Sequence, residues 1–474
     1  MTVQRDLAWQ NIEADYRAGV SRKLARYALA LDFKMLPPEV IHQAKRCLLD
    51  TLGCAIGAFD APGRPICEEV VGELGGTKEA TLFGTGERSN VLNATLFNSF
   101  LVRFLDYNDL GGGGHNSDAI PAILAISERE KISGPDFLTS VVLSYEIGQR
   151  FVDAARGVPV QKRGWCFDIR GGLSMPPSLG RLMGLNEEQV AHAIAICACH
   201  SNPLGILDAD REECVMAKNL RFGFVAYHAI MSCLLAQKGY TGPLRIVEGE
   251  AGLDQAVFQN EMDYELLLDF SGWRILNTRF KVLCTNGTNS GTVLATLALV
   301  KEHDLKPEDI ASVKIKAIPR QAGHTSTPAK KYPRNAESAD HSTFYANAFA
   351  IKNRSFGPES IEPHHFTDPV ILELIEKITV EADPDFSGYQ ASSEIITRDG
   401  ARYFKQIDTP HGLGNDPLSD KELEDKFTQM AEKRMDGKQV KQLIDMVWHL
   451  EKLDHMGKLM PLMVFAGPDS MGPG

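Results

Sequence analysis

The segment from Phe104 to Glu128 constrains this chain most, because it places four ionisable side chains around a run of four glycines, Gly111 to Gly114. The ionisable residues fall within thirteen positions and are Asp106, Asp109, His115 and Asp118. The helical apolar pattern of Ala94 to Leu105 and the apolar run Ala119 to Ile126 flank the loop, which indicates that it joins two buried elements. Buried charges are costly unless they are paired, so the segment predicts a shaped acid–base site and not a flexible surface loop.

Small residues are dense in two of the helices that the sequence predicts. Ala, Gly and Ser crowd the stretches 190–204 and 222–235, and small side chains allow helices to pack closely in a thick bundle. Another helix is expected from Val40 to Phe59, after two prolines. Asn186 looks like the N-cap of a further helix, in a capping box with Gln189. The chain is therefore mostly helical up to about residue 275.

The pattern changes after Lys281. Residues 312–318 alternate as a half-exposed strand should, a second strand-like stretch runs from Ser393 to Tyr403, and a charged amphipathic helical pattern returns from Asp420. We therefore predict a mainly α protein with an α+β insert. The expected units are a large all-helical domain, residues 1–278 completed by 408–474, and a smaller α+β lid domain, residues 279–407.

The loop and several later motifs resemble one protein family. Asp106-Tyr107-Asn108-Asp109 and His115-Asn116-Ser117-Asp118 are similar to paired elements of the MmgE/PrpD (2-methylcitrate dehydratase) family, which usually has proline where Asn116 stands. Further matches follow in order along the chain: Leu48–Gly53, Lys218–Leu220, Lys238–Pro243, Ala339–Ser342 and His411-Gly412 with Asn415 and Pro417–Ser419. Agreement in order over about 400 residues is far more specific than one motif. The resemblance implies a helical domain with a lid, and a homodimer.

Three residues are the expected catalytic groups. His115 suits either proton role because its ordinary pKa is near neutrality, and Asp106 suits a partner that orients or charges the imidazole. The resemblance implies that Lys218 faces the active site, where it can clamp a carboxylate together with Arg221. The other predicted substrate-binding residues are Asp109, Ser117, Asp118, Lys281 and His341.

Other readings remain open at several positions. Lys218 and Arg221 could be solvated cations on a helix surface. His341 could equally belong to a helix-cap network in which Asp340 and Ser342 satisfy backbone donors. His411 is more typical of a turn residue. Relatives often carry ionisable groups where this chain has Gly164–Phe167 and Gly287-Thr288, which leaves the substrate uncertain.

Composition excludes several other classes of function. The net charge of −12 disfavours nucleic acid and anionic membranes as partners. No apolar run looks long enough to span a bilayer, and the N-terminus lacks a signal or transit pattern, so a soluble cytoplasmic protein is expected. The nine cysteines are an odd number and read as reduced thiols. The sequence lacks motifs that bind an iron–sulfur cluster, a zinc ion or a nicotinamide cofactor. We therefore expect neither a metal nor another cofactor.

The sequence therefore leaves three hypotheses. The first is a cofactor-free hydro-lyase that dehydrates 2-methylcitrate or a similar tricarboxylate through a carbanion, or enediolate. The second, within the same family, is a cis-aconitate-type decarboxylase or a dicarboxylate epimerase. The third is a catalytically retired member that serves as a binding protein. In each case the partner is a small di- or tricarboxylate.

Overall fold

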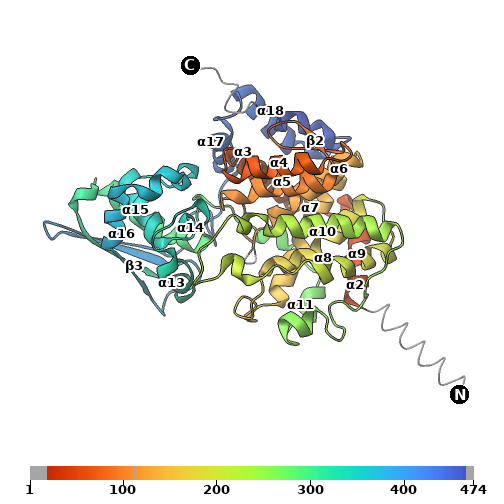
Figure 1. Ribbon diagram of the computed structural model, residues 1–474, viewed down its shortest axis with the longest axis horizontal. Helices are drawn as coiled ribbons and strands as arrows, with labels where there is room; N and C mark the ends of the chain where they lie inside the picture. The colour runs from red at the N-terminus through yellow and green to blue at the C-terminus, as the bar shows by residue number, and fades with distance from the viewer. Residues whose placement is uncertain (1–18, 112–113, 466–474) are drawn as a thin grey trace, which may run out of the picture.

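The computed structural model describes residues 19–111 and 114–465, and these residues are mainly helical, as expected (Figure 1). The helices that precede the sheet are α2 Val20–Ala30, α3 Pro38–Gly57, α4 Gly63–Leu74, α5 Val91–Phe104, α6 Ile120–Arg129, α7 Gly134–Ala154, α8 Gly171–Leu182, α9 Glu187–His200, α10 Ala217–Gln237 and α11 Tyr264–Leu268. The later helices are α12 Ser290–Glu302, α13 Pro319–Thr325, α14 Ala336–Ala339, α15 Thr343–Asn353, α16 Pro369–Lys377, α17 Asp420–Ala431 and α18 Gly437–Trp448. The strands are β1 Ala80–Thr81, β2 Arg88–Ser89, β3 Ile310–Ala317, β4 Ile378–Ala382, β5 Ala391–Thr397 and β6 Arg402–Ile407.

The N-terminal helices pack as the small residues predict. A Cβ atom added at Gly171, in α8, would lie 2.5 Å from a Val225 side-chain atom of α10, and one added at Gly172 would lie 3.1 Å from the Cα of Ala198 in α9. The three helices therefore approach at distances that larger side chains would prevent. The capping box predicted at Asn186 is present at the start of α9.

The C-terminal helix α17 packs on α3, which is more than 360 residues earlier in the chain (Figure 1). A Cβ at Gly53 would lie 2.7 Å from the Met430 side chain, so a glycine at this position allows close contact. Lys426 is buried in this contact and donates hydrogen bonds to Asp50 Oδ1 at 2.6 Å and to the Tyr107 carbonyl at 2.8 Å. This pairing ties the end of the chain to α3 and to the Asp106 loop.

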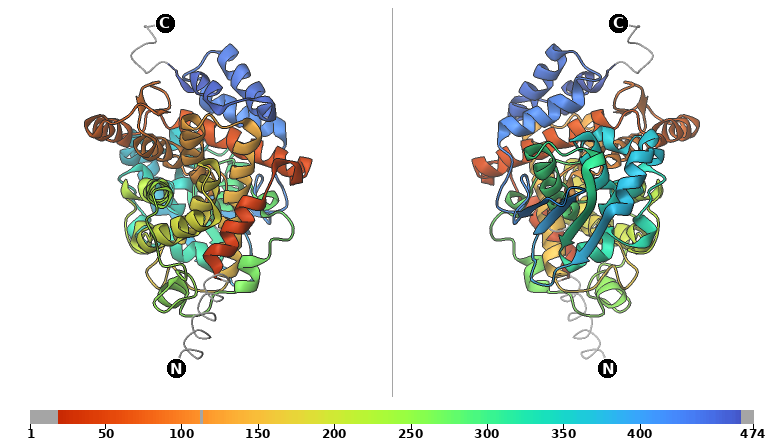
Figure 2. Two further views of the ribbon diagram at one scale, coloured as in Figure 1. Left: turned by 90° about the vertical axis from the view of Figure 1, so that its right-hand side faces the viewer. Right: turned by 90° about the vertical axis from the view of Figure 1, so that its left-hand side faces the viewer.

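A four-stranded sheet with its own helices lies to one side of the helical bundle (Figures 1 and 2). Its order is β4-β3-β5-β6, in which β3 and β4 are parallel and the other pairs are antiparallel. The single strand that we predicted over 393–403 is wrong, because a turn at residues 398–401 divides it into β5 and β6. The short edge strand β4 went unpredicted, since it follows α16 directly and is largely exposed.

Two sequence expectations need adjustment. Helix α10 is long and apolar enough to cross a membrane by length and composition, although 56% of its most apolar window is buried in protein, as in a core helix. All nine cysteines are free thiols, as expected. Of the pair taken as core filler, Cys197 is buried but Cys199 is exposed.

Candidate active site

The backbone of Asp106 is left-handed, with a φ of 44°. The residue lies just beyond the end of α5, and its amide donates to the Arg103 carbonyl at 3.1 Å. A side chain in this region is strained by about 1–2 kcal/mol, and aspartate and asparagine tolerate it better than most residues. Such strain is common at functional sites, where the surrounding contacts hold it.

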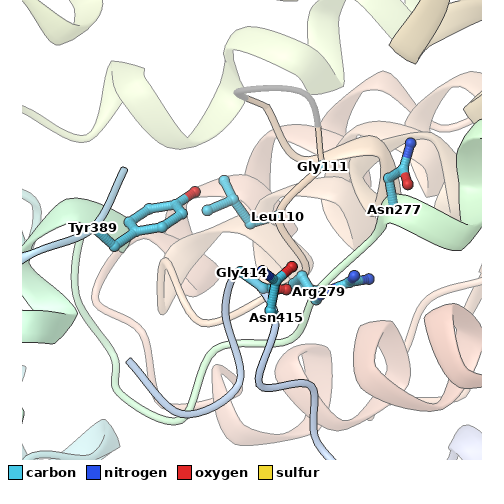
Figure 3. Close-up of a pocket in the computed structure, with 7 residues that line it drawn as sticks. All are labelled: Leu110, Gly111, Asn277, Arg279, Tyr389, Gly414 and Asn415. Carbon is cyan, nitrogen blue, oxygen red and sulfur yellow. Dashed lines mark hydrogen bonds between the residues drawn. The ribbon is translucent and has the colours of Figure 1, made fainter. Parts of the chain in front are cut away.

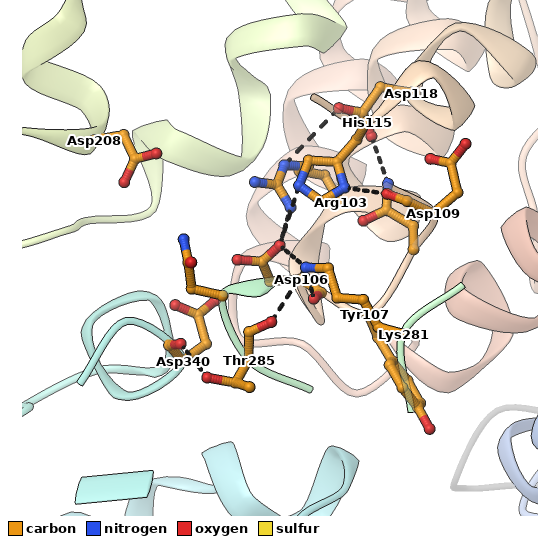
Figure 4. A network of polar contacts seen from close by, with 12 residues as sticks. Arg103, Asp106, Tyr107, Asp109, His115, Asp118, Asp208, Lys281, Thr285 and Asp340 are labelled. Atoms are coloured by element: carbon orange, nitrogen blue, oxygen red, sulfur yellow. Dashed lines mark hydrogen bonds and ion pairs between the residues drawn. The ribbon is translucent and has the colours of Figure 1, made fainter. Parts of the chain in front are cut away.

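Three cations surround the Asp106 carboxylate, and Figure 4 shows two of them, Arg103 and Lys281. Arg103 Nη1 and Lys281 Nζ both lie 2.7 Å from its Oδ1 atom. On the other side, Lys218 Nζ lies 3.5 Å from Oδ2. Burial favours the neutral acid, but these charges outweigh it and hold the pKa of Asp106 well below its ordinary value. Asp106 is therefore a fixed negative charge at the centre of the site.

His115 faces the same carboxylate as a neutral imidazole. Its Nε2 atom lies 3.4 Å from Asp106 Oδ1, and its Nδ1 lies 2.6 Å from the Asp109 carbonyl oxygen. Because a carbonyl can only accept, Nδ1 carries the proton and Nε2 carries the lone pair. Burial, and then the charges of Arg103 and Lys281, lower the pKa of His115 well below its ordinary value. The geometry thus presents a proton acceptor at Nε2.

Lys218 is fully buried, which excludes the reading of a solvated surface cation. Its Nζ atom donates to Asp340 Oδ2 at 2.9 Å and lies 3.2 Å from Nδ1 of His341. Burial lowers the pKa of Lys218, but Asp340 and then Asp106 more than offset this and raise it. Lys218 therefore stays charged between the loop and the segment around His341.

The helix-cap network expected at His341 is present in part. Ser342 is the N-cap of α15 and accepts from the Tyr345 amide. The Asp340 carboxylate pairs with Lys218 and caps no backbone donor among residues 19–111 and 114–465. His341 is itself buried, and Asn286 Nδ2 donates to its Nε2 at 3.0 Å. It therefore belongs to the site's ionic network as well as to the helix start.

Arg221 lies one step outside this centre. Its Nε atom is 2.5 Å from Asp168 and its Nη1 atom is 3.3 Å from Asp208. Asp168 also pairs with Arg170, which in turn donates to the carbonyl of His115 at 2.8 Å. Arg221 thus anchors the loop through a chain of ion pairs, and a direct carboxylate clamp by Arg221 stays a prediction.

Three predicted substrate ligands are buried in the loop, and their contact with a substrate stays a prediction. Asp109, Ser117 and Asp118 are all buried. The hydroxyl of Ser117 donates to Asp109, and Asn108 donates to Asp118 at 2.8 Å. Burial raises the pKa of Asp109 to about 6 and that of Asp118 to about 7. These contacts indicate that the three residues hold the loop in shape.

Three ionisable residues of the network around Asp106 were not predicted from the sequence. Arg103 sits one helical turn before Asp106, a spacing that could have suggested the ion pair. Asp340 was taken for a cap, and Asp208 carried no local signal at all. Both contact residues more than 100 positions away, which no short motif reveals.

A cavity of about 180 Å³ opens beside the loop (Figure 3), and neither Asp106, His115 nor Lys218 lines it. It is lined by Leu110, Gly111, Asn277, Arg279, Tyr389, Gly414 and Asn415. The side chains of Asp106, His115 and Lys218 are all buried. A small molecule that is to contact all three therefore needs a movement of the surrounding segments.

The two positions that lack the usual ionisable groups border the network. Gly287 and Thr288 belong to a short 3₁₀ turn, and the Thr288 amide and hydroxyl both donate to the side chain of Asn286, the residue that contacts His341. On the other side, the Cys166 thiol caps the turn that holds Asp168. Neutral groups therefore stand at both places.

Comparison with known proteins agrees with the sequence pattern. Residues 22–265 match the MmgE/PrpD N-terminal domain, and residues 290–452 match the MmgE/PrpD C-terminal domain. Among curated proteins, cis-aconitate decarboxylase of Homo sapiens is 25% identical over 91% of this chain and 92% of its own length. The cis-aconitate decarboxylase of Aspergillus terreus is 22% identical, covering 96% and 98%. The 2-methylcitrate dehydratase of Escherichia coli is 21% identical, covering 81% and 84%.

Proposed function

Because this chain belongs to the MmgE/PrpD family and is a lyase, we propose that it dehydrates 2-methylcitrate or a similar tricarboxylate without a cofactor. Dehydration removes a weakly acidic proton beside one carboxylate while hydroxide leaves the neighbouring carbon. The reaction needs a neutral base, a proton donor for the leaving oxygen, and cations that stabilise the enediolate.

The arrangement around Asp106 supports these roles. Nε2 of neutral His115 accepts the substrate proton, and the fixed charge of Asp106 stabilises the imidazolium that results. The ammonium groups of Lys218 and Lys281 lie on the same carboxylate and face the developing negative charge. In this proposal Lys218 also protonates the departing hydroxide. The observation that carries the proposal is the contact of one ionised carboxylate with both a neutral imidazole and two lysines.

A direct assay tests this proposal. The purified protein is incubated with 2-methylcitrate, and the conjugated alkene product is followed by its ultraviolet absorbance. The expected result is a rise in absorbance without release of carbon dioxide. Carbon dioxide release from cis-aconitate, with no turnover of 2-methylcitrate, would contradict dehydration and support decarboxylation, the second candidate function.

That second candidate is a cis-aconitate-type decarboxylase. The decarboxylase relatives favour it, since they align over more of the chain than the dehydratases do. Loss of carbon dioxide also leaves a carbanion, which the same lysines would stabilise before the charged Lys218 donates a proton to it. A dicarboxylate epimerase would use the same centre. A retired binding protein would bind these acids without turning them over.

Assembly as a homodimer is part of the proposal. Large apolar side chains are exposed around the start of α10 and the 3₁₀ turn Gly205–Asp208, namely Leu204, Ile206, Val215, Met216 and Phe224. An exposed apolar patch of this kind suits an interface between two copies. Light scattering should therefore give about twice the chain mass of 52.2 kDa. A monomer at micromolar concentration would contradict it.

A further inference from the structure

We propose that Asp208, His324 and His341 form a binding site for one divalent transition-metal ion of the zinc type. Asp208 ends the 3₁₀ turn Gly205–Asp208, His324 lies in α13, and His341 follows α14. One ligand atom from each residue lies within 4.8 Å of the other two. Imidazole nitrogen and carboxylate oxygen are ligands that zinc prefers, and two histidines with one carboxylate form a common protein set.

The spacing of the three atoms fits a metal centre. Oδ1 of Asp208 lies 3.3 Å from Nε2 of His341 and 3.5 Å from Nε2 of His324. Ligand atoms bonded at about 2.0–2.1 Å to a tetrahedral ion lie roughly 3.3–3.4 Å from each other. Neither imidazole makes a hydrogen bond to Asp208 among the residues that the structure describes, although Asn286 contacts Nε2 of His341 and the Cys214 thiol contacts Oδ1 of Asp208.

Both imidazoles are held from behind by carboxylates. Nδ1 of His341 contacts Asp340, and Nδ1 of His324 lies 2.8 Å from Asp210 Oδ1. Histidines that bind a metal usually donate their second ring N–H to such a group, which fixes the tautomer and the ring orientation. The two contacts leave the lone pairs on Nε2, the atoms that face Asp208. This outer pattern is what distinguishes the cluster from a chance grouping of polar residues.

The ligand set, and not the net charge around it, favours the ion. Arg221 lies 3.3 Å from Oδ2 of Asp208, the Cys214 thiol lies 4.0 Å from its Oδ1, and Lys218 is paired with Asp340. The carboxylates of Asp208, Asp210 and Asp340 are balanced by Arg221, Lys218 and the nearby Lys330. Asn286 donates to Nε2 of His341, so a bound ion would take the place of that amide.

The ion would join the turn before α10 to segments on the sheet side of the molecule. It would also hold His341, the neighbour of Lys218. Zinc is therefore expected to stabilise the folded protein against heat and to slow turnover, because the site must open for its substrate.

Metal titration of the chelator-treated full-length protein tests the site. Zinc binding is measured by calorimetry, and cobalt(II) binding by its visible absorbance. One equivalent should bind, and H324Q should abolish binding at that stoichiometry. Asp210→Asn keeps every ligand and should weaken binding roughly tenfold to a hundredfold. Thermal unfolding of each metal-free variant checks that it is folded.

A matched control uses the other histidine cluster, Glu362, His364 and His365, in which Glu362 and His364 are exposed. H364Q should bind one equivalent as the natural chain does. Equal binding by the natural chain and H324Q would overturn the proposal. So would binding that is lost in H364Q, or the absence of stoichiometric binding to the natural chain.

Discussion

Nε2 of His115 and Oδ1 of Asp106 lie 3.4 Å apart, and the pair combines a histidine whose pKa is lowered with an aspartate whose pKa is also lowered. Two groups that pair only to stabilise a fold would normally carry opposite charges. Here burial, and then the charges of Arg103 and Lys281, keep the imidazole neutral, while the arginine and the lysines around Asp106 keep the carboxylate ionised. A neutral base beside a fixed negative charge is suited to proton abstraction.

Replacing His115 by alanine should mainly lower kcat, by about a hundredfold to ten-thousandfold, because a positioned base contributes that much. Replacing His341 by alanine should mainly raise KM, since His341 lies beside Lys218 at the edge of the site. Steady-state kinetics of both variants measure the split. Equal effects on kcat for the two variants would contradict the assigned roles.

Two substitutions of Asp106 separate the effect of its charge from the effect of its backbone conformation. Asp106→Asn removes the charge but tolerates the left-handed conformation, so it should fold and lose most activity. Asp106→Ala should in addition lower the free energy of unfolding by about 1 kcal/mol relative to Asp106→Asn, from backbone strain. Thermal unfolding compares the two variants. An alanine variant as stable as the asparagine variant would show that the conformation costs nothing.

The contribution of Asp118 to stability should fall as pH rises from about 4 to about 7. Burial raises the pKa of Asp118 to about 7, so this residue keeps a proton in the folded protein that the unfolded chain has lost in this window. The contribution of Asp118 to the free energy of unfolding therefore decreases with pH, by up to about 4 kcal/mol. Asp118→Asn cannot ionise and should flatten this dependence. Thermal unfolding at several pH values gives the comparison, and parallel curves would refute it.

Removing the buried ammonium of Lys426 should destabilise the protein. Lys426→Met leaves the buried Asp50 without its paired ammonium, which costs about 3–5 kcal/mol in such pairs. Asp50→Leu combined with Lys426→Met should recover much of this loss, because no lone charge remains. Lys441→Gln, at an exposed position of α18, is the control and should change little. Denaturant unfolding measures all three.

Exhaustive chelation should leave activity unchanged or higher. The proposed proton transfers use Asp106, His115 and Lys218, and an ion held by His341 would hinder opening of the site. Activity is measured before and after treatment with a chelator in air. A strict dependence on added iron or zinc would contradict cofactor-free catalysis.

The sequence predicted the centre of the site better than its surroundings. Asp106 and His115 are close in the chain, so their crowding around glycines was visible without a structure, and Lys218 followed from the resemblance. Asp340 and Asp208 join the centre only through the tertiary fold, since each contacts a residue more than 100 positions away. The spacing of neighbouring residues in the sequence does not reveal such distant pairs.

The fold was predictable to a similar degree. The capping box at Asn186 marks the start of a helix in the sequence itself. The many small residues likewise indicate that the helices pack closely in a bundle. Strand β4 has five residues and pairs in parallel with β3, which lies more than 60 positions earlier. Its pairing depends on that distant partner, so its own residues do not identify it. The pattern of apolar and polar residues likewise does not predict the left-handed backbone of Asp106.

The contact between α17 and α3 has a consequence for biosynthesis. The ribosome makes α3 early, but Met430 and Lys426, which cover Gly53 and Asp50, are made some 370 residues later. At about 5–20 residues per second the nascent chain exposes this apolar face for tens of seconds. Release of a chain that stops before residue 420 should therefore yield an aggregating product, even though the motif of the active-site loop is complete in it.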